Sequence, residues 1–304
     1  MGLLGRGLYR LVVIIVSWNV KDLLAACLAS LPAGADGMLV HTVVVDNAST
    51  DGSAEVVRER FPSVELIECR ENLGFARANN IALRKFANDT DYFLLLNPDT
   101  VISPGALREM VDFMDTHPEA GIAGAKVVKP DGTLDWPCKR SYITPSVLFY
   151  KALGLDRLFP RSPRFGRYQL TYLDPDETHE VDSVVGAFLM IRRQCVVAIG
   201  PLDESFFMYW EDMDWCYRAK SAGWKIFYVP ATTIIHHKAQ STGKRSYQMI
   251  YCWYHLAWRV YQKCIAPNYS AGVNCLVWMG FHTMCVVSLI ANFARSEKRV
   301  PGRR

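Results

Sequence analysis

The sequence up to residue 128 alternates apolar runs with segments of helical spacing, and this alternation constrains the fold more than any other feature. The runs are rich in Val, Ile and Leu, which is typical of strands buried on both faces. Strands separated by helices form a parallel sheet covered by helices on both sides. The expected strands are 11–18, 41–48, 64–70, 91–99 and 120–128, and the expected helices are 21–31, 53–61, 74–87 and 104–117.

Polar residues follow three of these strands at the point where each strand ends. They are Ser17-Trp18-Asn19, Asp46-Asn47 and Asn97-Pro98-Asp99. Sheets of this class bind ligands beyond the carboxyl ends of their strands, so the sequence predicts a ligand site at this edge. For the third group, a turn that merely ends the strand is the structural alternative.

The bulk composition describes a globular chain with one charged end. Half of the 304 residues are apolar and 21% are charged, and the net charge is +4. Residues 295–304 contain five Arg or Lys and one Glu, so they account for this charge and the remainder is close to neutral. We therefore expect no nucleic-acid-binding surface.

The cysteines and the N-terminus both favour a cytoplasmic protein. Nine cysteines occur without a C-x-x-C pair, which argues against a structural zinc site and for reduced thiols. The apolar run at 11–16 is short and is followed by Ser17-Trp18-Asn19 rather than by a cleavage site. We therefore interpret it as a buried strand and not as a signal peptide.

An acidic cluster lies among aromatic residues at 209–218, YWEDMDWCYR. On a helix, Glu211 and Asp214 should share a face while Asp212 points elsewhere. Carboxyl groups that lie close together among aromatic rings have raised pKa values unless a nearby cation stabilises their charged form. Arg218 is a candidate for that cation. The cluster predicts a general base, and an exposed acidic first turn is the structural alternative.

Two further motifs carry polar chemistry. His236 and His237 end another apolar strand, where neighbours point to opposite sides, so at most one can face a site as a metal ligand. A structural histidine is the alternative for either residue.

In ENLGFARANN, 71–80, Asn72-Leu73-Gly74 leads into a helix whose first N–H groups, together with Arg77, suit an anionic ligand. The sequence has no dinucleotide-binding glycine motif and no P-loop.

The C-terminal region has a different composition. Residues 247–265 are dense in Tyr and Trp, and 270–294 contain no charged residue. The second segment is long enough to span a bilayer, which requires ~20 residues. Asn274, His282 and Ser288 weaken that interpretation, so a helix lying in the membrane interface and a core or dimer-forming helix stay open as alternatives.

Taken in order, these motifs resemble the inverting family 2 glycosyltransferases of GT-A fold, and most closely their bacterial rhamnosyltransferase-like branch. The matching segments are VSWN, VVVDNASTDGS, ENLGFARANN, LLLNPDT, GAFLMIRR, FFMYWEDMDWCYR and IIHHKAQST, which cover residues 11–242. The resemblance implies an α/β fold with a doubly wound, mixed but mostly parallel sheet. It places a GT-A domain at 1–245, with a nucleotide-binding half at 1–128 and an acceptor and catalytic half at 129–245. A helical, membrane-associating extension follows at 246–304.

The same resemblance implies roles for individual residues. Asn97-Pro98-Asp99 stands where the family has a metal-binding D-x-D, so Asp99, together with His236, would bind Mg²⁺ or Mn²⁺. Asp212 would be the general base, and Glu211 would position the acceptor. Asp46 would lie near the base of the donor. The complete set of implied donor-binding residues is Ser17, Asn19, Asp46, Asn47, Asp51, Asn72, Gly74, Arg77, Asn79 and Asn97.

The implied activity is transfer of a sugar from a nucleotide-sugar donor, first dTDP-rhamnose and then UDP-sugars, to a hydroxyl of a glycan or of a polyprenyl-diphosphate-linked acceptor. The setting would be bacterial cell-surface polysaccharide synthesis at the inner face of the membrane, with a homodimer left open. A sugar nucleotidyltransferase and a non-catalytic sugar- or lipid-binding scaffold are the alternatives. The first would carry a glycine-rich, Arg-containing loop where this chain has Ser17-Trp18-Asn19, and the second has no need of Asp99, Glu211 and Asp212 together.

Overall fold

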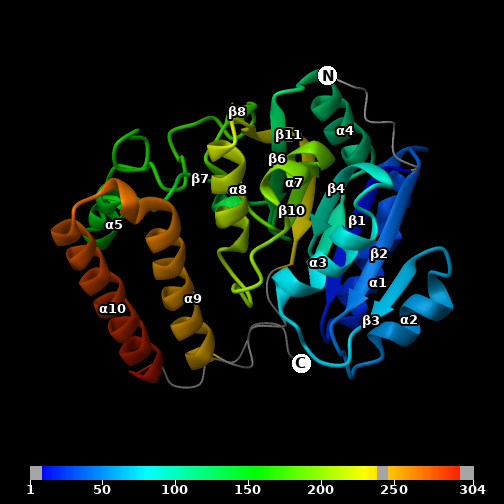
Figure 1. The fold of residues 1–304 in the computed structure, drawn as a ribbon, viewed down its shortest axis with the longest axis horizontal. Coiled ribbons are helices and arrows are strands. Elements are labelled where there is room, and N and C mark those ends of the chain that lie inside the picture. The colour runs from blue at the N-terminus through cyan, green and yellow to red at the C-terminus, as the bar shows by residue number, and fades with distance from the viewer. Residues whose placement is uncertain (1–8, 238–245, 295–304) are drawn as a thin grey trace.

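The computed structural model describes residues 9–237 and 246–294. A twisted sheet flanked by helices forms the main body, and two long helices lie side by side at one end (Figure 1). The strands are β1 (Tyr9–Ser17), β2 (Val40–Asp46), β3 (Glu65–Glu68), β4 (Thr90–Leu96), β5 (Thr100–Ile102), β6 (Ala120–Val128), β7 (Lys139–Arg140), β8 (His179–Glu180), β9 (Ser183–Val184), β10 (Phe188–Arg192) and β11 (Lys225–His236). The helices are α1 (Lys21–Ala35), α2 (Ser53–Arg60), α3 (Phe75–Lys85), α4 (Ala106–Thr116), α5 (Pro145–Ala152), α6 (Leu155–Leu158), α7 (Arg193–Ile199), α8 (Glu211–Ser221), α9 (Ser246–Val260) and α10 (Ala271–Ala294), with a π-helical turn at Tyr261–Ile265.

The main sheet has the order β3-β2-β1-β4-β10-β6-β11-β5, with β8 beside β11. Its longer pairs are parallel, namely β1 with β2, β1 with β4, and β6 with β11, while β10 runs antiparallel between β4 and β6. The predicted fold class, a mixed but mostly parallel α/β sheet, is therefore confirmed. Residues 11–15 of β1 are fully buried, as expected for a strand covered on both faces.

The register of the strands brings the polar strand ends to one edge. Ser17 pairs with Asp46, and Ile15 pairs with Leu96, directly before Asn97. After Pro98 the chain turns into the short strand β5, which pairs antiparallel with the end of β11 and sets Thr100 opposite His236. Residues far apart in the sequence thus meet beyond the carboxyl ends of β1, β2 and β4.

The helices α9 and α10 form an antiparallel pair. Tyr254 of α9 lies 2.9 Å from Ser288 of α10, and Tyr261 donates a hydrogen bond of 2.7 Å to Asn274. A second hydrophobic cluster joins this pair to the main body, because Phe206, Trp210 and Met213 pack with residues of the pair. Residues 246–294 are therefore packed against the main body through a shared core.

Helix α10 is apolar on both its buried and its exposed faces. The most apolar 18-residue stretch of residues 271–293 has a mean hydropathy of 1.7, and only 17% of it is buried within the protein. This is the one described helix that is long and apolar enough to cross a membrane. Its exposed large side chains are Leu276, Trp278, Met279, Val286, Val287, Ile290 and Phe293.

Candidate active site

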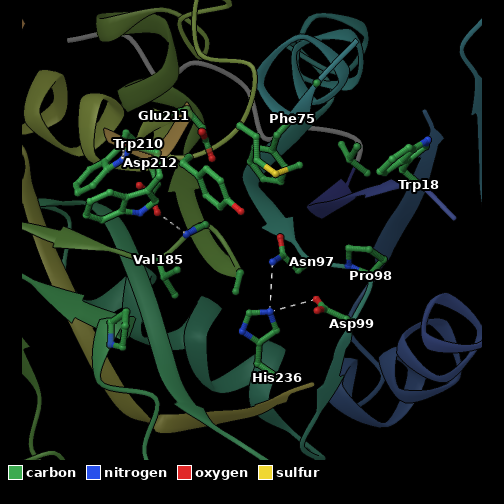
Figure 2. Close-up of a pocket in the computed structure, with 18 of the residues that line it drawn as sticks. Trp18, Phe75, Asn97, Pro98, Asp99, Val185, Trp210, Glu211, Asp212 and His236 are labelled. Atoms are coloured by element: carbon green, nitrogen blue, oxygen red, sulfur yellow. Dashed lines mark hydrogen bonds and ion pairs between the residues drawn. The ribbon is translucent and has the colours of Figure 1, made fainter. Parts of the chain in front are cut away.

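A cavity of about 480 Å³ lies between the carboxyl edge of the sheet and the start of α8. This size is typical of small-ligand sites. Asp99 and His236 line one part of it, Glu211 and Asp212 line another, and Asn97 lies between them (Figure 2). The other lining residues are Val16, Trp18, Val20, Asn47, Asn72, Gly74, Phe75, Pro98, Pro137, Arg140, Lys151, Tyr168, Gln169, Val185, Gly186, Ala187, Met208, Tyr209, Trp210 and Trp253.

Asp99 and His236 form a pair at the sheet edge. His236 Nε2 lies 3.1 Å from Asp99 Oδ1 and 3.4 Å from Asn97 Nδ2, and its Nδ1 lies 3.9 Å from Asp135 Oδ2. Burial alone would lower the pKa of His236, but the carboxylates of Asp135 and Asp99 outweigh it and raise that pKa to about 9. The pairing of β5 with β11 creates this contact, because it holds His236 beside the residue that follows Asp99.

These two side chains fit a divalent cation that is shared with a phosphate ligand. The described residues contain no group of three or more His, Cys, Asp or Glu side chains arranged to hold a metal, so the protein offers two ligands here. Mg²⁺ commonly takes one or two protein carboxylates and completes its shell with substrate phosphates and water. A carboxylate and an imidazole on the wall of an open cavity suit this incomplete type of site.

Asp212 is held rigidly at the start of α8. Its Oδ2 accepts hydrogen bonds from Arg140 Nη2 at 2.7 Å and from the Gly186 backbone N–H at 3.0 Å, and its Oδ1 accepts one from Met213 N. Both Asp212 and Arg140 are largely buried, with side-chain exposures of 9% and 10%. Burial alone would lower the pKa of Arg140, but the negative charge of Asp212 outweighs it and raises that pKa.

Glu211 has the opposite environment, although it is the adjacent residue. Its Oε2 is buried and has no hydrogen-bond partner among the described residues. Burial, together with the nearby charge of Asp212, raises the pKa of Glu211 to about 8. At neutral pH Glu211 therefore retains its proton and can donate a hydrogen bond into the cavity, whereas Asp212 beside it is paired with Arg140.

The backbone before α8 is strained. Tyr209 and Trp210 have φ of 75° and 72°, values that non-glycine residues rarely adopt. Trp210 is anchored by a hydrogen bond of 2.9 Å from its indole to Trp253 O of α9. Strain held in place by surrounding packing is common at functional sites, and here it directs the first residues of α8 into the cavity.

The turn before α3 also requires its particular residues. A Cβ at Gly74 would lie 2.5 Å from Phe207 O, and Phe75 N donates a hydrogen bond of 2.7 Å to the same oxygen. Asn47 donates to Asn72 at 2.9 Å and accepts from Leu73 N at 2.8 Å. The cavity wall near residues 72–75 is therefore fixed by the end of β2 on one side and by the loop before α8 on the other.

The predicted donor-binding residues divide into three groups. Asn47, Asn72, Gly74 and Asn97 line the cavity. Ser17, Asp46 and Asn79 lie behind the wall, and each has a buried side-chain oxygen without a partner among the described residues. These three oxygen atoms could each form a further hydrogen bond, although none of the three residues lines the cavity.

Asn19, Asp51 and Arg77 lie outside the cavity wall. Asn19 accepts a hydrogen bond of 2.8 Å from Thr50 N. Asp51 accepts from Lys21 N and from both the N–H and the hydroxyl of Ser53; these bonds outweigh burial and lower the pKa of Asp51. Arg77 is about half exposed and lies 3.9 Å from Glu204. The contacts of the first two residues brace the loops that follow β1 and β2.

The structure corrects two expectations about the acidic cluster. Glu211 and Asp212 line the cavity together, whereas Asp214, which was expected to share a face with Glu211, is fully buried behind it. Arg218 pairs with Asp214 at 2.9 Å, so it is not the cation that compensates Glu211 and Asp212. The reason is that α8 begins at Glu211, which places residues 211 and 212 in the first turn, at the end of the helix that borders the cavity. As expected, only one histidine of the pair faces the site, since His236 lines the cavity and His237 is exposed.

Four site residues were not anticipated from the sequence: Arg140, Asp135, Lys151 and Tyr168. All belong to the region 129–180, which is rich in Pro, Arg and aromatic residues and has no clear periodicity. The only signal in the sequence was a long irregular segment, which often carries function.

The sequence matches the family model described as Glycosyl transferase family 2 over residues 12–200. It is 33% identical over 244 residues to N-acetylglucosaminyl-diphospho-decaprenol L-rhamnosyltransferase of Mycobacterium tuberculosis, covering 76% of this chain and 77% of the relative. It is 27% identical over 170 residues to the rhamnosyltransferase WbbL of Escherichia coli, covering 54% and 61% of the two chains.

Solved structures show the same fold. The mannosyltransferase PcManGT of Pyrobaculum calidifontis, in complex with GDP-Man and Mn²⁺, superposes with a TM-score of 0.56 at 17% identity, covering 96% of this chain and 77% of that one. The sheet order, the cavity at its carboxyl edge and the match over more than half of the sequence agree. The chain therefore belongs to glycosyltransferase family 2 and is similar to the rhamnosyltransferases of that family.

Proposed function

We propose that this glycosyltransferase moves L-rhamnose from dTDP-rhamnose to a hydroxyl of a sugar linked through diphosphate to a polyprenyl lipid, with inversion at the anomeric carbon. The observation that carries the proposal is the single cavity that holds Asp99 and His236 at one part and Glu211 and Asp212 at another. The similarity to rhamnosyltransferases, including one named for a decaprenol-linked acceptor, supports the choice of donor and acceptor. Family membership favours this function over a nucleotidyltransferase or a scaffold.

The donor lies along the residues that follow β1, β2 and β4, with its nucleotide near Asn47, Asn72 and Gly74. Asp99 and, once its imidazole has released its proton, His236 would hold Mg²⁺ or Mn²⁺. A bound divalent cation supplies charge neutralisation for the departing nucleoside diphosphate. Asn97 lies 3.4 Å from His236 and keeps the imidazole turned toward the cavity.

Asp212 removes the proton from the acceptor hydroxyl as that oxygen attacks the anomeric carbon. Arg140 and Gly186 N–H fix the direction of the carboxylate, so its free lone pairs face the cavity. Glu211, protonated at neutral pH, donates a hydrogen bond to the acceptor and orients it. The bond between the anomeric carbon and the diphosphate breaks on the opposite face, and the diphosphate leaves with the pair of electrons.

The C-terminal region places the enzyme on the inner surface of the cell membrane. The exposed apolar side chains of α10, together with the aromatic α9, provide area for burial in lipid. A second copy of the chain covering α10 is the alternative, which size measurement in detergent-free solution tests.

A transfer assay with the full-length protein tests the proposal. Nucleotide sugars are first compared for thermal stabilisation in Mn²⁺, because a bound donor raises the melting temperature by mass action. The stabilising donor is then incubated with lipid-diphosphate-linked GlcNAc, with and without EDTA. We expect dTDP-rhamnose to stabilise most and transfer to stop in EDTA. Formation of nucleotide sugar from sugar phosphate and nucleoside triphosphate, or absence of any turnover with every donor, would contradict the proposal.

A further inference from the structure

The catalytic cavity continues into a smaller apolar crevice between α5, α9 and α10. Four residues line both spaces, namely Lys151, Tyr168, Trp210 and Trp253. The rest of the crevice is formed by apolar and aromatic side chains: Ile143, Val147, Leu148, Tyr254, Phe281 and Met284. A ligand that leaves the cavity on this side therefore passes from a polar wall to an apolar one.

Lys151 stands at the boundary between the two spaces. Its Nζ lies 4.4 Å from the centre of the Tyr168 ring, and no carboxylate of residues 9–237 or 246–294 lies within ion-pair distance of it. The other cation on this wall, Arg140, is already paired with Asp212 at 2.7 Å. Burial lowers the pKa of Lys151, which the nearby charge of Asp156 partly offsets, and an anionic ligand beside Lys151 would favour its charged form in the same way.

Tyr168 connects Lys151 to the catalytic pair. Ser141 N donates a hydrogen bond of 2.9 Å to Tyr168 O, which holds the phenol ring next to Arg140, and the charges of Arg140 and Asp212 both act on this phenol. One aromatic ring therefore separates Lys151 from the Arg140–Asp212 pair.

We propose that Lys151 binds the diphosphate of the lipid-linked acceptor and that the start of the prenyl chain lies against the mouth of the apolar crevice between α5, α9 and α10, whose volume of about 30 Å³ leaves the chain itself outside it. This inference rests on the proposed function. The occupant must be polar where it meets Asp212, anionic at Lys151 and apolar beyond it, which describes a prenyl-diphosphate-linked sugar. The crevice reaches Phe281 and Met284 of α10, the helix with the exposed apolar face, so the remainder of the lipid has a path to the membrane.

Binding of farnesyl diphosphate to the full-length protein tests the site without turnover. Calorimetry in EDTA compares farnesyl diphosphate, farnesol and inorganic diphosphate, each in the presence of saturating dTDP to fill the donor region. We expect farnesyl diphosphate to bind at least tenfold more tightly than either fragment. Lys151→Gln should weaken it at least tenfold and Lys151→Arg should restore it, whereas Lys129→Gln, at an exposed lysine outside both spaces, should bind as the wild type does.

The crevice is tested separately with Leu148→Asp, which should weaken farnesol and farnesyl diphosphate while leaving inorganic diphosphate unchanged. If a variant does not fold, inhibition of the wild-type enzyme tests the same inference. Farnesyl diphosphate should inhibit transfer by competing with the acceptor and not with the donor. Equal binding of farnesyl diphosphate by Lys151→Gln and wild type, or its displacement by dTDP, overturns the inference. Absence of transfer by the wild type contradicts the proposed function instead, so the two failures are distinguishable.

Discussion

At the scale of single residues, the site depends on two adjacent carboxylates that the fold treats differently. Asp212 receives three hydrogen bonds, one of them from the buried Arg140, while Glu211 is buried with an oxygen that has no partner among the described residues. An ionised group stabilised by a cation can accept a proton, and a protonated group can donate one. The difference between the two environments is the basis for the two roles proposed above.

Asp212→Asn should reduce transfer by ~10²–10⁴-fold, because an amide cannot accept the acceptor proton. Donor affinity should change little, since Asp212 faces the acceptor side of the cavity. Turnover with saturating donor and donor-induced thermal stabilisation measure the two effects. Asp112→Asn, at an exposed position of α4, is the matched control. Turnover of Asp212→Asn close to the wild-type value would remove Asp212 from the mechanism.

Glu211 should make the free energy of unfolding depend on pH. Its pKa is raised from 4.5 to about 8 in the folded state, so between these values the folded protein binds more protons than the unfolded one. Stability from this group is therefore complete below about pH 4.5 and is lost as the pH rises toward 8. Urea denaturation at several pH values measures the slope, and Glu211→Gln should reduce it. An unchanged slope in Glu211→Gln would show that other groups cause the dependence.

Asp99→Asn should weaken binding of Mn²⁺ in the presence of dTDP by at least about tenfold, because it replaces the only carboxylate that lines the cavity beside His236. Calorimetric titration of Mn²⁺ measures this without turnover, and Asp112→Asn again serves as the control. Equal Mn²⁺ affinity in Asp99→Asn and wild type would place the metal elsewhere.

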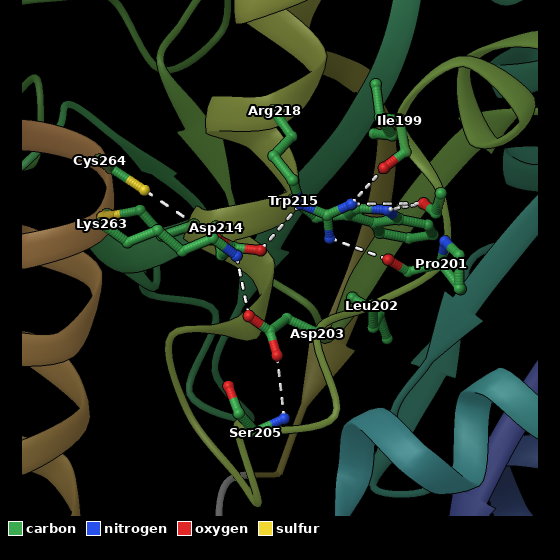
Figure 3. Close-up of polar contacts among 12 residues, drawn as sticks. Ile199, Pro201, Leu202, Asp203, Ser205, Asp214, Trp215, Arg218, Lys263 and Cys264 are labelled. Carbon is green, nitrogen blue, oxygen red and sulfur yellow. Dashed lines mark hydrogen bonds and ion pairs between the residues drawn. The ribbon is translucent and has the colours of Figure 1, made fainter.

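At the scale of elements, helix α8 joins the catalytic residues to the C-terminal region. Asp214, which is fully buried, contacts Arg218 of the same helix at 2.9 Å and Lys263 of the π-helical turn at 2.6 Å (Figure 3). Lys263 also lies 2.8 Å from Asp203. Burial alone would raise the pKa of Asp203, but its hydrogen bonds from Lys263 and Ser205 outweigh burial and lower that pKa. The start of α8 carries Glu211 and Asp212, so the turn after α9 supports the helix that positions them.

Lys263→Met should lower the free energy of unfolding by roughly 1–2 kcal/mol, since it leaves Asp214 with one cation instead of two and Lys263 itself is partly screened by solvent. Lys225→Met, which removes a surface contact of 4.0 Å with Glu180, should cost less than about 0.5 kcal/mol. Chemical denaturation of both variants provides the comparison. Equal stability of the two variants would show that the Asp214 contact adds nothing beyond a surface ion pair.

The sequence predicted the elements that depend on local patterns, and it missed those that depend on distant pairing. The strands 11–18, 41–48 and 91–99 and the helices between them appear close to their predicted ranges, because their apolar periodicity is local. Arg140 could not be assigned, because its partner Asp212 is 72 residues away and nothing near Arg140 indicates that pairing. The same holds for β5, a strand of three residues that exists through its pairing with β11.

At the scale of the whole molecule, the α9–α10 pair has two functions. Its inner face completes the second hydrophobic cluster with Phe206, Trp210 and Met213, while α10 leaves a large apolar area uncovered within the described chain. Deletion of residues 246–304 would therefore remove both the proposed membrane contact and most of the second hydrophobic cluster. Substitutions on the outer face of α10 separate the two effects.

Leu276→Gln, Val287→Gln and Ile290→Gln combined should move the protein from the membrane fraction to the soluble fraction, because these side chains are 58–66% exposed and pack little within the chain. The melting temperature should stay close to that of the wild type. Deletion of 246–304 should instead give aggregated protein. Retention of the triple variant in the membrane fraction would contradict a role for this face, and loss of a dimer in light scattering would assign the face to self-association.

The pairing of β5 with β11 also sets the order in which the protein can become functional during synthesis. Asn97 and His236 are 139 residues apart, whereas β1, β2, β3 and β4 are joined by short parallel crossovers within the first hundred residues. Contacts between distant segments form late because the loop between them must first be closed. A ribosome-bound chain can therefore assemble the nucleotide-binding strands early, but it cannot bring Asp99 and His236 together until β11 has emerged. If Asp99 and His236 hold the metal as proposed, the growing chain cannot form that site until nearly all of residues 9–237 have been translated.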